Sequence, residues 1–87
     1  MAKIEVYSTA YCPYCMRAKA LLRAKGVEYL EIDVDDDPTL RVEMVKRAGG
    51  RRSVPEIFIN GRLIGGYDEL RALEDKGALD PLLAQPS

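Results

Sequence analysis

The 87-residue sequence contains no histidine and no tryptophan, and only two of its residues are cysteines. A zinc site would therefore have to recruit carboxylates, which is a poor match to structural zinc sites. No apolar stretch approaches the roughly 20 residues that a membrane helix needs, so we expect no contact with membranes. Thirteen basic residues nearly balance fourteen acidic ones. No basic stripe is interleaved with aromatic residues, which argues against nucleic acid as a partner.

The length and composition are typical of one small globular domain over residues 1–87, with a tail at 84–87 that we expect to fray. No apolar signal-peptide stretch precedes the first strand pattern, so a cytoplasmic location is expected. In a reducing compartment, a cysteine pair is more often catalytic than structural.

Hydrophobic periodicity and turn residues predict four strands and three helices. The strands are expected at residues 4–7, 27–34, 56–59 and 62–64, and the helices at 13–25, 38–48 and 67–76, with a possible further turn at 78–83. Asn60-Gly61 is a strong hairpin signal. The order β-α-β-α-β-β-α predicts an α/β fold in which a mixed four-stranded sheet has helices on both faces.

Three consecutive acidic residues, Asp35 to Asp37, allow two interpretations. They resemble an acidic metal site, but a solvated loop that ends in a helix N-cap at Asp37 explains them better. Pro38 follows directly, and proline is favoured at the first position of a helix.

The two cysteines form the motif Cys12-Pro13-Tyr14-Cys15, which lies between two predicted strands and is typical of thioredoxin-like redox sites. Residues three apart on a helix are neighbours, at a separation that a disulfide tolerates. Pro13 suits the first helical turn, which places Cys12 at the N-cap beside unpaired amides. These amides and the helix dipole stabilise a thiolate. Cys12 is therefore the predicted nucleophile, and Cys15 is the thiol that resolves its mixed disulfides.

Three other interpretations of the cysteine pair remain open from the residues alone. A zinc half-site would need ligands beyond the two cysteines. A static disulfide would close a loop so short that it adds little stability. Two inert buried thiols would leave the open helix start and Pro13 without a role.

Together with Val54-Pro55 and Gly65-Gly66-Tyr67-Asp68, the cysteine motif resembles the glutaredoxin family over about residues 4–83. The resemblance implies a thioredoxin fold and an enzyme, a glutathione-disulfide oxidoreductase. Such an enzyme reduces protein–glutathione mixed disulfides through Cys12 alone, and protein disulfides through Cys12 and Cys15. Glutathione would be the reducing co-substrate, no metal is expected, and the protein would act as a monomer.

The resemblance also implies a glutathione site made of Tyr14, Arg52, Ser53, Val54, Pro55, Gly66, Tyr67 and Asp68. With a cis bond before Pro55, the Val54 backbone can pair with glutathione as a strand would. A trans proline that opens an edge strand is the alternative. A carboxylate of glutathione can dock at the helix start near Gly66, with Asp68 accepting from its ammonium group. Asp68 can instead serve as the N-cap.

Adjacent arginines, Arg51 and Arg52, could bind the glycine carboxylate of glutathione or remain solvated. The chain also departs from the family pattern. Thr9 stands where many members have a lysine, Ser53 replaces the usual threonine, and Tyr67 takes the place of a cysteine or a small residue.

Two other functions fit the same motif. One is a dimer that holds an iron–sulfur cluster through Cys12 and glutathione, as related proteins do. The other is an electron donor that a thioredoxin-type reductase serves. Absorbance after anaerobic reconstitution and the preference for a reductase separate these functions from the first.

Overall fold

A computed structural model describes residues 2–86 of the chain. Its elements in chain order are β1 (Ile4–Ser8), α1 (Pro13–Ala24), β2 (Leu30–Asp33), α2 (Pro38–Arg47), β3 (Glu56–Ile59), β4 (Arg62–Gly65), α3 (Tyr67–Asp75) and α4 (Leu79–Ala84). The predicted order is confirmed, with α4 added at the position of the possible extra turn.

The second strand is shorter than the predicted range 27–34. Gly26 adopts a positive φ of 72° and ends α1. The Val27 amide still donates to the Leu22 carbonyl, so the chain is turning where a strand was expected. Val27 and Tyr29 instead pack against the core below the sheet.

The sheet has the strand order β2-β1-β3-β4. β1 is parallel to β2 and antiparallel to β3, while β3 and β4 form a hairpin. The hairpin turns at Asn60 and Gly61, whose φ angles are 52° and 80°. Positive φ at both positions is what a two-residue hairpin requires, so the turn signal in the sequence is confirmed.

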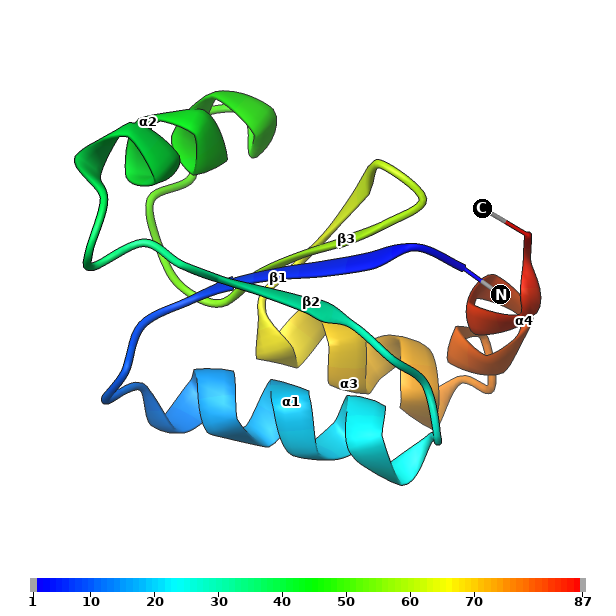
Figure 1. The fold of residues 1–87 in the computed structure, drawn as a ribbon. Helices are drawn as coiled ribbons and strands as arrows, with labels where there is room; N and C mark the ends of the chain where they lie inside the picture. The colour runs from blue at the N-terminus through cyan, green and yellow to red at the C-terminus, as the bar shows by residue number, and fades with distance from the viewer. Residues whose placement is uncertain (1, 87) are drawn as a thin grey trace.

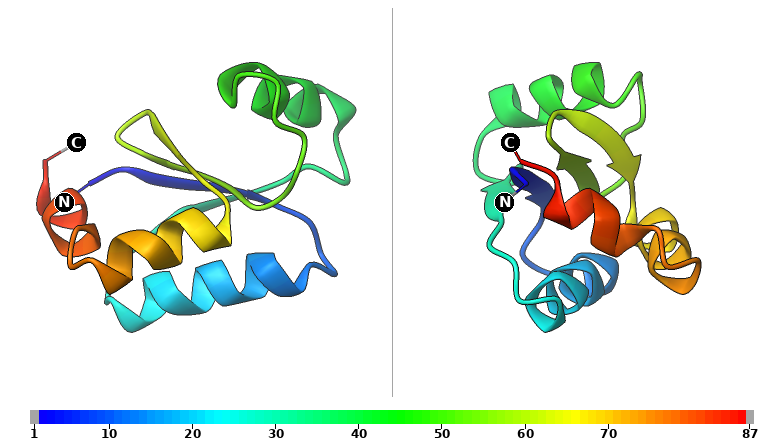
Figure 2. Two further views of the ribbon diagram at one scale, coloured as in Figure 1. Left: turned by 180° about the vertical axis from the view of Figure 1, so that it is seen from behind. Right: turned by 90° about the vertical axis from the view of Figure 1, so that its right-hand side faces the viewer.

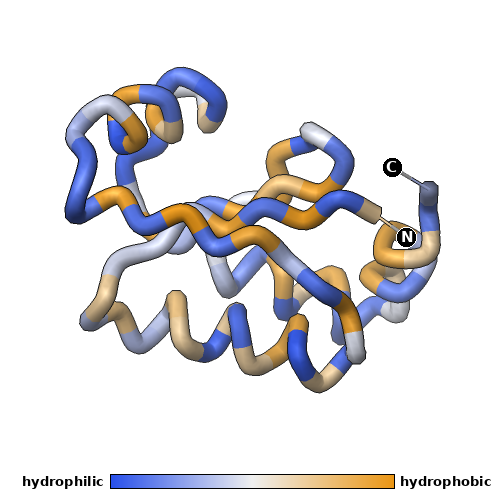
Figure 3. The backbone as a smooth tube through the Cα atoms, viewed as in Figure 1, coloured by the Kyte–Doolittle hydropathy of each residue, from blue (hydrophilic) through white to orange (hydrophobic). Residues whose placement is uncertain are grey.

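Helices cover both faces of the sheet, as Figures 1 and 2 show: α1 and α3 lie on one side, and α2 lies on the other. This arrangement divides the core in two. The larger cluster joins the sheet to α1, α3 and α4, and the smaller one packs Met44 and Ala48 of α2 on Tyr7 and Phe58. Hydrophobic segments accordingly recur at intervals along the helices and the central strands, between hydrophilic ones (Figure 3).

The C-terminal segment is attached to the domain at several points. Ala84 closes α4, one residue beyond the expected end of that turn. The Ala2 amide donates to the Leu83 carbonyl, and the Asn60 side chain donates to the Pro86 carbonyl. Ser87 lies outside the described residues. Over residues 2–86, the longest helices are too short and too polar to cross a membrane.

Candidate active site

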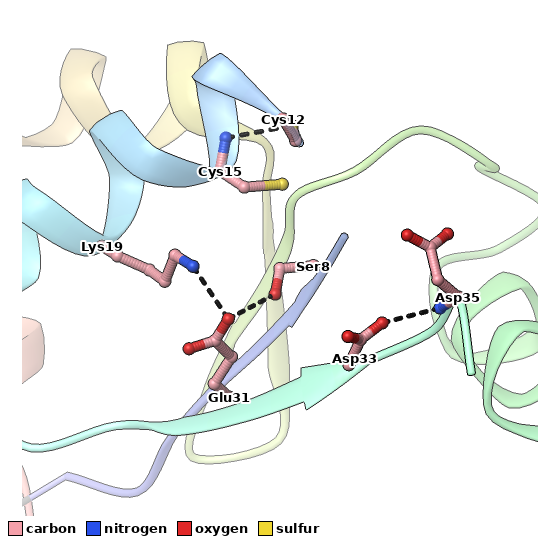
Figure 4. Close-up of polar contacts among 7 residues, drawn as sticks. All are labelled: Ser8, Cys12, Cys15, Lys19, Glu31, Asp33 and Asp35. Carbon is pink, nitrogen blue, oxygen red and sulfur yellow. Dashed lines mark hydrogen bonds and ion pairs between the residues drawn. The ribbon is translucent and has the colours of Figure 1, made fainter. Parts of the chain in front are cut away.

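The first helix begins at the cysteine motif, as the sequence predicts. Cys12 is the N-cap of α1, Pro13 is the first helical residue, and the Cys15 amide donates to the Cys12 sulfur over 3.1 Å (Figure 4). A sulfur therefore occupies the position that a side-chain oxygen takes at most helix starts. The sulfur thus meets an amide donor at the positive end of the helix dipole.

The two thiols have different surroundings. Both cysteines are free; Cys12 is partly exposed, whereas Cys15 has an exposed fraction of 0%. Burial, followed by the hydrogen bond with Cys12, raises the pKa of Cys15 to about 12. The exposed sulfur can thus meet an incoming disulfide, while the buried Cys15 is shielded from solvent and lies next to Cys12.

A groove lies beside Cys12, between the start of α1, the segment before β3 and the start of α3. Its lining comprises Tyr14, Arg51, Ser53, Val54, Pro55, Gly66, Tyr67, Asp68 and Glu69. The Val54-Pro55 peptide bond is cis, as the family resemblance implies. The Cys12 sulfur lies 3.7 Å from the Val54 carbonyl oxygen, within range of a thiol hydrogen bond.

All of the predicted glutathione residues except Arg52 line this groove. Arg52 is exposed and lies with Arg41, Val42, Val45 and Lys46 in a separate hollow beside α2. Arg51 faces the groove instead. Arg51 and Arg52 are adjacent in the sequence, but their side chains lie in different hollows.

The N-cap of α3 is Gly66, and not Asp68, and the side chain of Glu69 satisfies the Gly66 amide. Gly66 is the N-cap and Asp68 is the second helical residue, so the interpretation of Asp68 as the cap is wrong. The Gly66 amide donates to Glu69 Oε1 over 2.8 Å. The same oxygen lies 2.8 Å from Arg51 Nη2. Hydrogen bonds to the Gly66 amide and to Arg51 hold the pKa of Glu69 below its ordinary range.

Arg51 continues this network into the interior. Its Nε lies 3.5 Å from Glu56 Oε2, which also accepts from the Ser53 hydroxyl over 3.1 Å. Glu56 has an exposed fraction of 0%, and its Oε1 has no hydrogen-bond partner among the described residues. Burial raises the pKa of the Glu56 carboxyl above its usual value, because the charged form is poorly solvated.

Aromatic side chains border the groove and the exposed sulfur. The Tyr14 and Tyr67 rings are tilted, with centroids 6.5 Å apart, and the Arg17 guanidinium lies over Tyr14. Tyr11 and Met16 are also exposed. The sulfur is therefore approached across an apolar rim, which suits a peptide substrate.

Sequence reasoning missed Glu56 and Glu69. A usable signal existed for Glu69, because a glutamate three residues after an N-cap is half of a capping box. Nothing local marks Glu56 as buried, since its strand pattern would equally suit an exposed glutamate.

The three aspartates before α2, Asp35 to Asp37, form a loop whose last residue is the N-cap of the helix. The Thr39 amide donates to Asp37 Oδ1, so Asp37 is the N-cap as predicted. The Asp35 amide donates to Asp33. Within the described part of the chain, histidine, cysteine and acidic side chains are nowhere gathered in a group of three or more that could hold a metal.

A thioredoxin-like fold with a dithiol at the start of its first helix defines a thiol–disulfide oxidoreductase. The family model described as Glutaredoxin matches residues 4–64. Glutaredoxin 3 of Escherichia coli K12 is 53% identical over 83 residues, covering 95% of this chain and 99% of that protein. The chain belongs to the glutaredoxin family.

Solved structures agree with this assignment. The crystal structure of a buckwheat glutaredoxin–glutathione complex matches with a TM-score of 0.86 and 33% identity, covering 94% of this chain and 76% of that one. The solution structure of glutaredoxin from Brucella melitensis matches with a TM-score of 0.83 and 52% identity, covering 95% and 89%. The predicted fold class is confirmed.

Proposed function

We propose that this protein uses glutathione to reduce protein–glutathione mixed disulfides, and uses both cysteines to reduce protein disulfides. One observation carries the proposal: the partly exposed Cys12 sulfur borders a groove that is lined by the Val54 backbone and the start of α3. The glutathione complex of the buckwheat relative supports the choice of ligand. In this proposal, the protein acts as a monomer in the cytoplasm.

Glutathione would lie along the groove with its sulfur at Cys12. The Val54 backbone would pair with its cysteine portion, and Tyr14 and Tyr67 would flank it. Its γ-glutamyl carboxylate would meet the amides at the start of α3, with Asp68 accepting from the ammonium group. Arg51 is engaged by Glu56 and Glu69, so we assign the glycine carboxylate to the exposed Arg52, which the glycine end would reach by extending beyond the groove toward the hollow beside α2.

The proposed reaction is a pair of thiol–disulfide exchanges. The Cys12 thiolate attacks the glutathione sulfur of the mixed disulfide, forming a bond to glutathione and releasing the substrate protein as a thiolate that takes up a proton. The thiolate of a second glutathione then attacks that bond. It releases Cys12 and forms glutathione disulfide, so the net reaction consumes one free glutathione and converts the mixed disulfide into a free protein thiol and glutathione disulfide.

Protein disulfides follow a second route. Cys12 attacks one sulfur of the substrate, and Cys15 then displaces the substrate by forming a bond with Cys12. Glutathione reduces this internal disulfide afterwards. The buried position of Cys15 restricts it to this intramolecular step.

The test is glutathione-coupled reduction of a small glutathione mixed disulfide by wild type, Cys12→Ser and Cys15→Ser. We expect Cys12→Ser to abolish turnover and Cys15→Ser to retain most of it. A requirement for Cys15 with this substrate would overturn the assigned roles. Faster turnover with thioredoxin reductase than with glutathione would overturn glutathione as the reductant.

A further inference from the structure

The buried thiol poses a problem for the second route of the proposed function. Cys15 must be a thiolate to attack the mixed disulfide on Cys12. Burial and the neighbouring Cys12 oppose its ionisation and raise the pKa of Cys15 to about 12. Near neutral pH the reactive form is scarce, so a nearby charge that raises or lowers this pKa changes the amount of thiolate and the rate of resolution.

Lys19 provides a positive charge on the next turn of α1, four residues after Cys15 and on the same helix face. Its ammonium group lies 2.8 Å from Glu31 Oε2 on β2, and its side chain has an exposed fraction of 14%. Ser8 at the end of β1 donates to the same oxygen over 3.0 Å. Figure 4 shows the Cys15 side chain and these contacts in the layer between α1 and the sheet.

We propose that Lys19, held in place by Glu31 and Ser8, is a positioning residue that sets the rate at which Cys15 resolves a mixed disulfide. The inference rests on the roles given to the two cysteines in the proposed function. The ammonium charge lowers the pKa of Cys15, against the larger effect of burial. Glu31 orients the ammonium group and also neutralises part of its charge.

Few other groups act on this thiol. Cys12 at the start of the same helix raises the pKa of Cys15, and a backbone hydrogen bond from Thr9, in the loop before the helix, lowers it. Arg23 acts on Glu31. Across the sheet, the buried Glu56 faces Ser53 and Arg51. Asp68 of α3 lines the groove on the far side of Cys12.

The step that Lys19 affects is balanced within the protein and its substrate. Cys15 loses its proton to solvent and attacks Cys12, whose bond to the substrate sulfur breaks. The substrate leaves as a thiolate and is protonated. The two cysteines are oxidised by two electrons, and the substrate disulfide is reduced by two.

Both exchanges can be observed with one equivalent of dithiobis(nitrobenzoate), which needs no glutathione. Cys12 attacks first and releases one nitrothiobenzoate, and resolution by Cys15 releases the second, so stopped-flow absorbance shows two phases. A rise of one pKa unit at Cys15 reduces its thiolate tenfold but makes the remainder more nucleophilic. With a Brønsted slope of about 0.4–0.5, the net slowing is about three- to fourfold.

We expect Lys19→Met to slow the second phase about threefold per unit of pKa rise and to shift its pH profile upward, leaving the first phase unchanged. Lys19→Arg keeps the charge and should restore the rate. Glu31→Gln keeps an oxygen that can accept from Lys19 but removes the neutralising charge, so it should accelerate the second phase. A slower second phase in Lys19→Met and a faster one in Glu31→Gln would show that Lys19 acts through its charge, because loss of structural support would slow both variants.

Lys25→Met is the matched control, because Lys25 pairs with Glu74 and Asp80 at the other end of α1. It should leave both phases unchanged. Equal slowing by Lys19→Met and Lys25→Met would overturn the inference, as would Lys19→Met and Glu31→Gln changing the rate in the same direction. Failure of the glutathione-coupled assay with an intact two-phase trace would refute the proposed co-substrate alone.

Discussion

The starts of α1 and α3 face the same groove, yet their amides are used differently. At α1 the cap is the partly exposed Cys12 sulfur, which accepts from the Cys15 amide. At α3 the N-cap is Gly66, whose amide donates to the side chain of Glu69, and Glu69 is held by Arg51. The first helix start presents the sulfur that we propose as nucleophile, and the second is already partly filled by a carboxylate of its own.

The difference has a chemical consequence. A helix start attracts anions because its first amides lack partners within the helix. At α1 that attraction acts on the reacting sulfur itself. At α3, Glu69 takes one donor, so a ligand carboxylate would have to use the amides of Tyr67 and Asp68, and Arg51 offsets the repulsion between the two carboxylates.

Gly65→Ala should have the largest effect on the α3 side. Gly65 has a φ of 117°, and an added Cβ would collide with Glu69 Oε1 and lie 2.9 Å from Arg51 Nη1. We expect the free energy of unfolding to fall by about 1–3 kcal/mol, as for other strained backbones. The KM for glutathione should rise, because the network that shapes the groove must move. Urea unfolding and glutathione-dependent kinetics measure the two effects.

Gly26→Ala is the control for backbone strain alone. Gly26 also has a positive φ, of 72°, but an added Cβ would meet nothing within 4 Å. It should lose stability and keep the KM for glutathione. If both variants raise the KM equally, the close approach of Glu69 and Arg51 to Gly65 has no part in binding.

The features that the sequence predicted well depend on residues close together in the chain. The Cys12 and Asp37 caps, each followed by a proline, and the turn at Asn60-Gly61 are local signals, and all three are confirmed. Local patterns also sufficed for the order of the elements, because each strand and helix has its own periodicity.

The features that it missed depend on residues brought together by the topology. Arg51 and Glu69 are 18 positions apart, and Lys19 and Glu31 are 12 apart. No pattern along the chain marks such pairs, because their meeting depends on how the strands are ordered in the sheet. The separation of Arg51 from Arg52 has the same origin, since adjacent side chains there point to different hollows.

Replacing the cap of α1 should separate stability from chemistry. Serine is a preferred N-cap and alanine is not, so Cys12→Ser should be more stable than Cys12→Ala by about 1 kcal/mol. Both variants should be inactive. Asp37→Ala, which removes the cap of α2, should lose a similar amount and keep its activity. Urea unfolding of all three variants measures this, and equal stability of the two Cys12 variants would show that a side-chain cap at position 12 does not stabilise α1.

Glu56→Gln should have the smallest effect, and its sign depends on pH. The folded pKa of Glu56 is raised above the ordinary value of 4.5, so ionisation destabilises the fold. The free energy of unfolding of the wild type is therefore highest below the unfolded pKa of Glu56, where the carboxyl is neutral, and it falls as the pH rises through the folded pKa. Glutamine, which stays neutral, should make the protein more stable than wild type at neutral pH, with the difference vanishing below about pH 4.5.

Glu5→Gln supplies the opposite case at another carboxylate of the sheet. The hydrogen-bonded Arg47 guanidinium lowers the pKa of Glu5 below 4.5, so its charge stabilises the fold. That contribution is present above the unfolded pKa and is lost as the pH falls through the folded one. Glu5→Gln should therefore be less stable than wild type at neutral pH. If Glu56→Gln is destabilising at neutral pH as well, Arg51 pairs with Glu56 strongly enough to outweigh burial, and the α3 network is held together by charge.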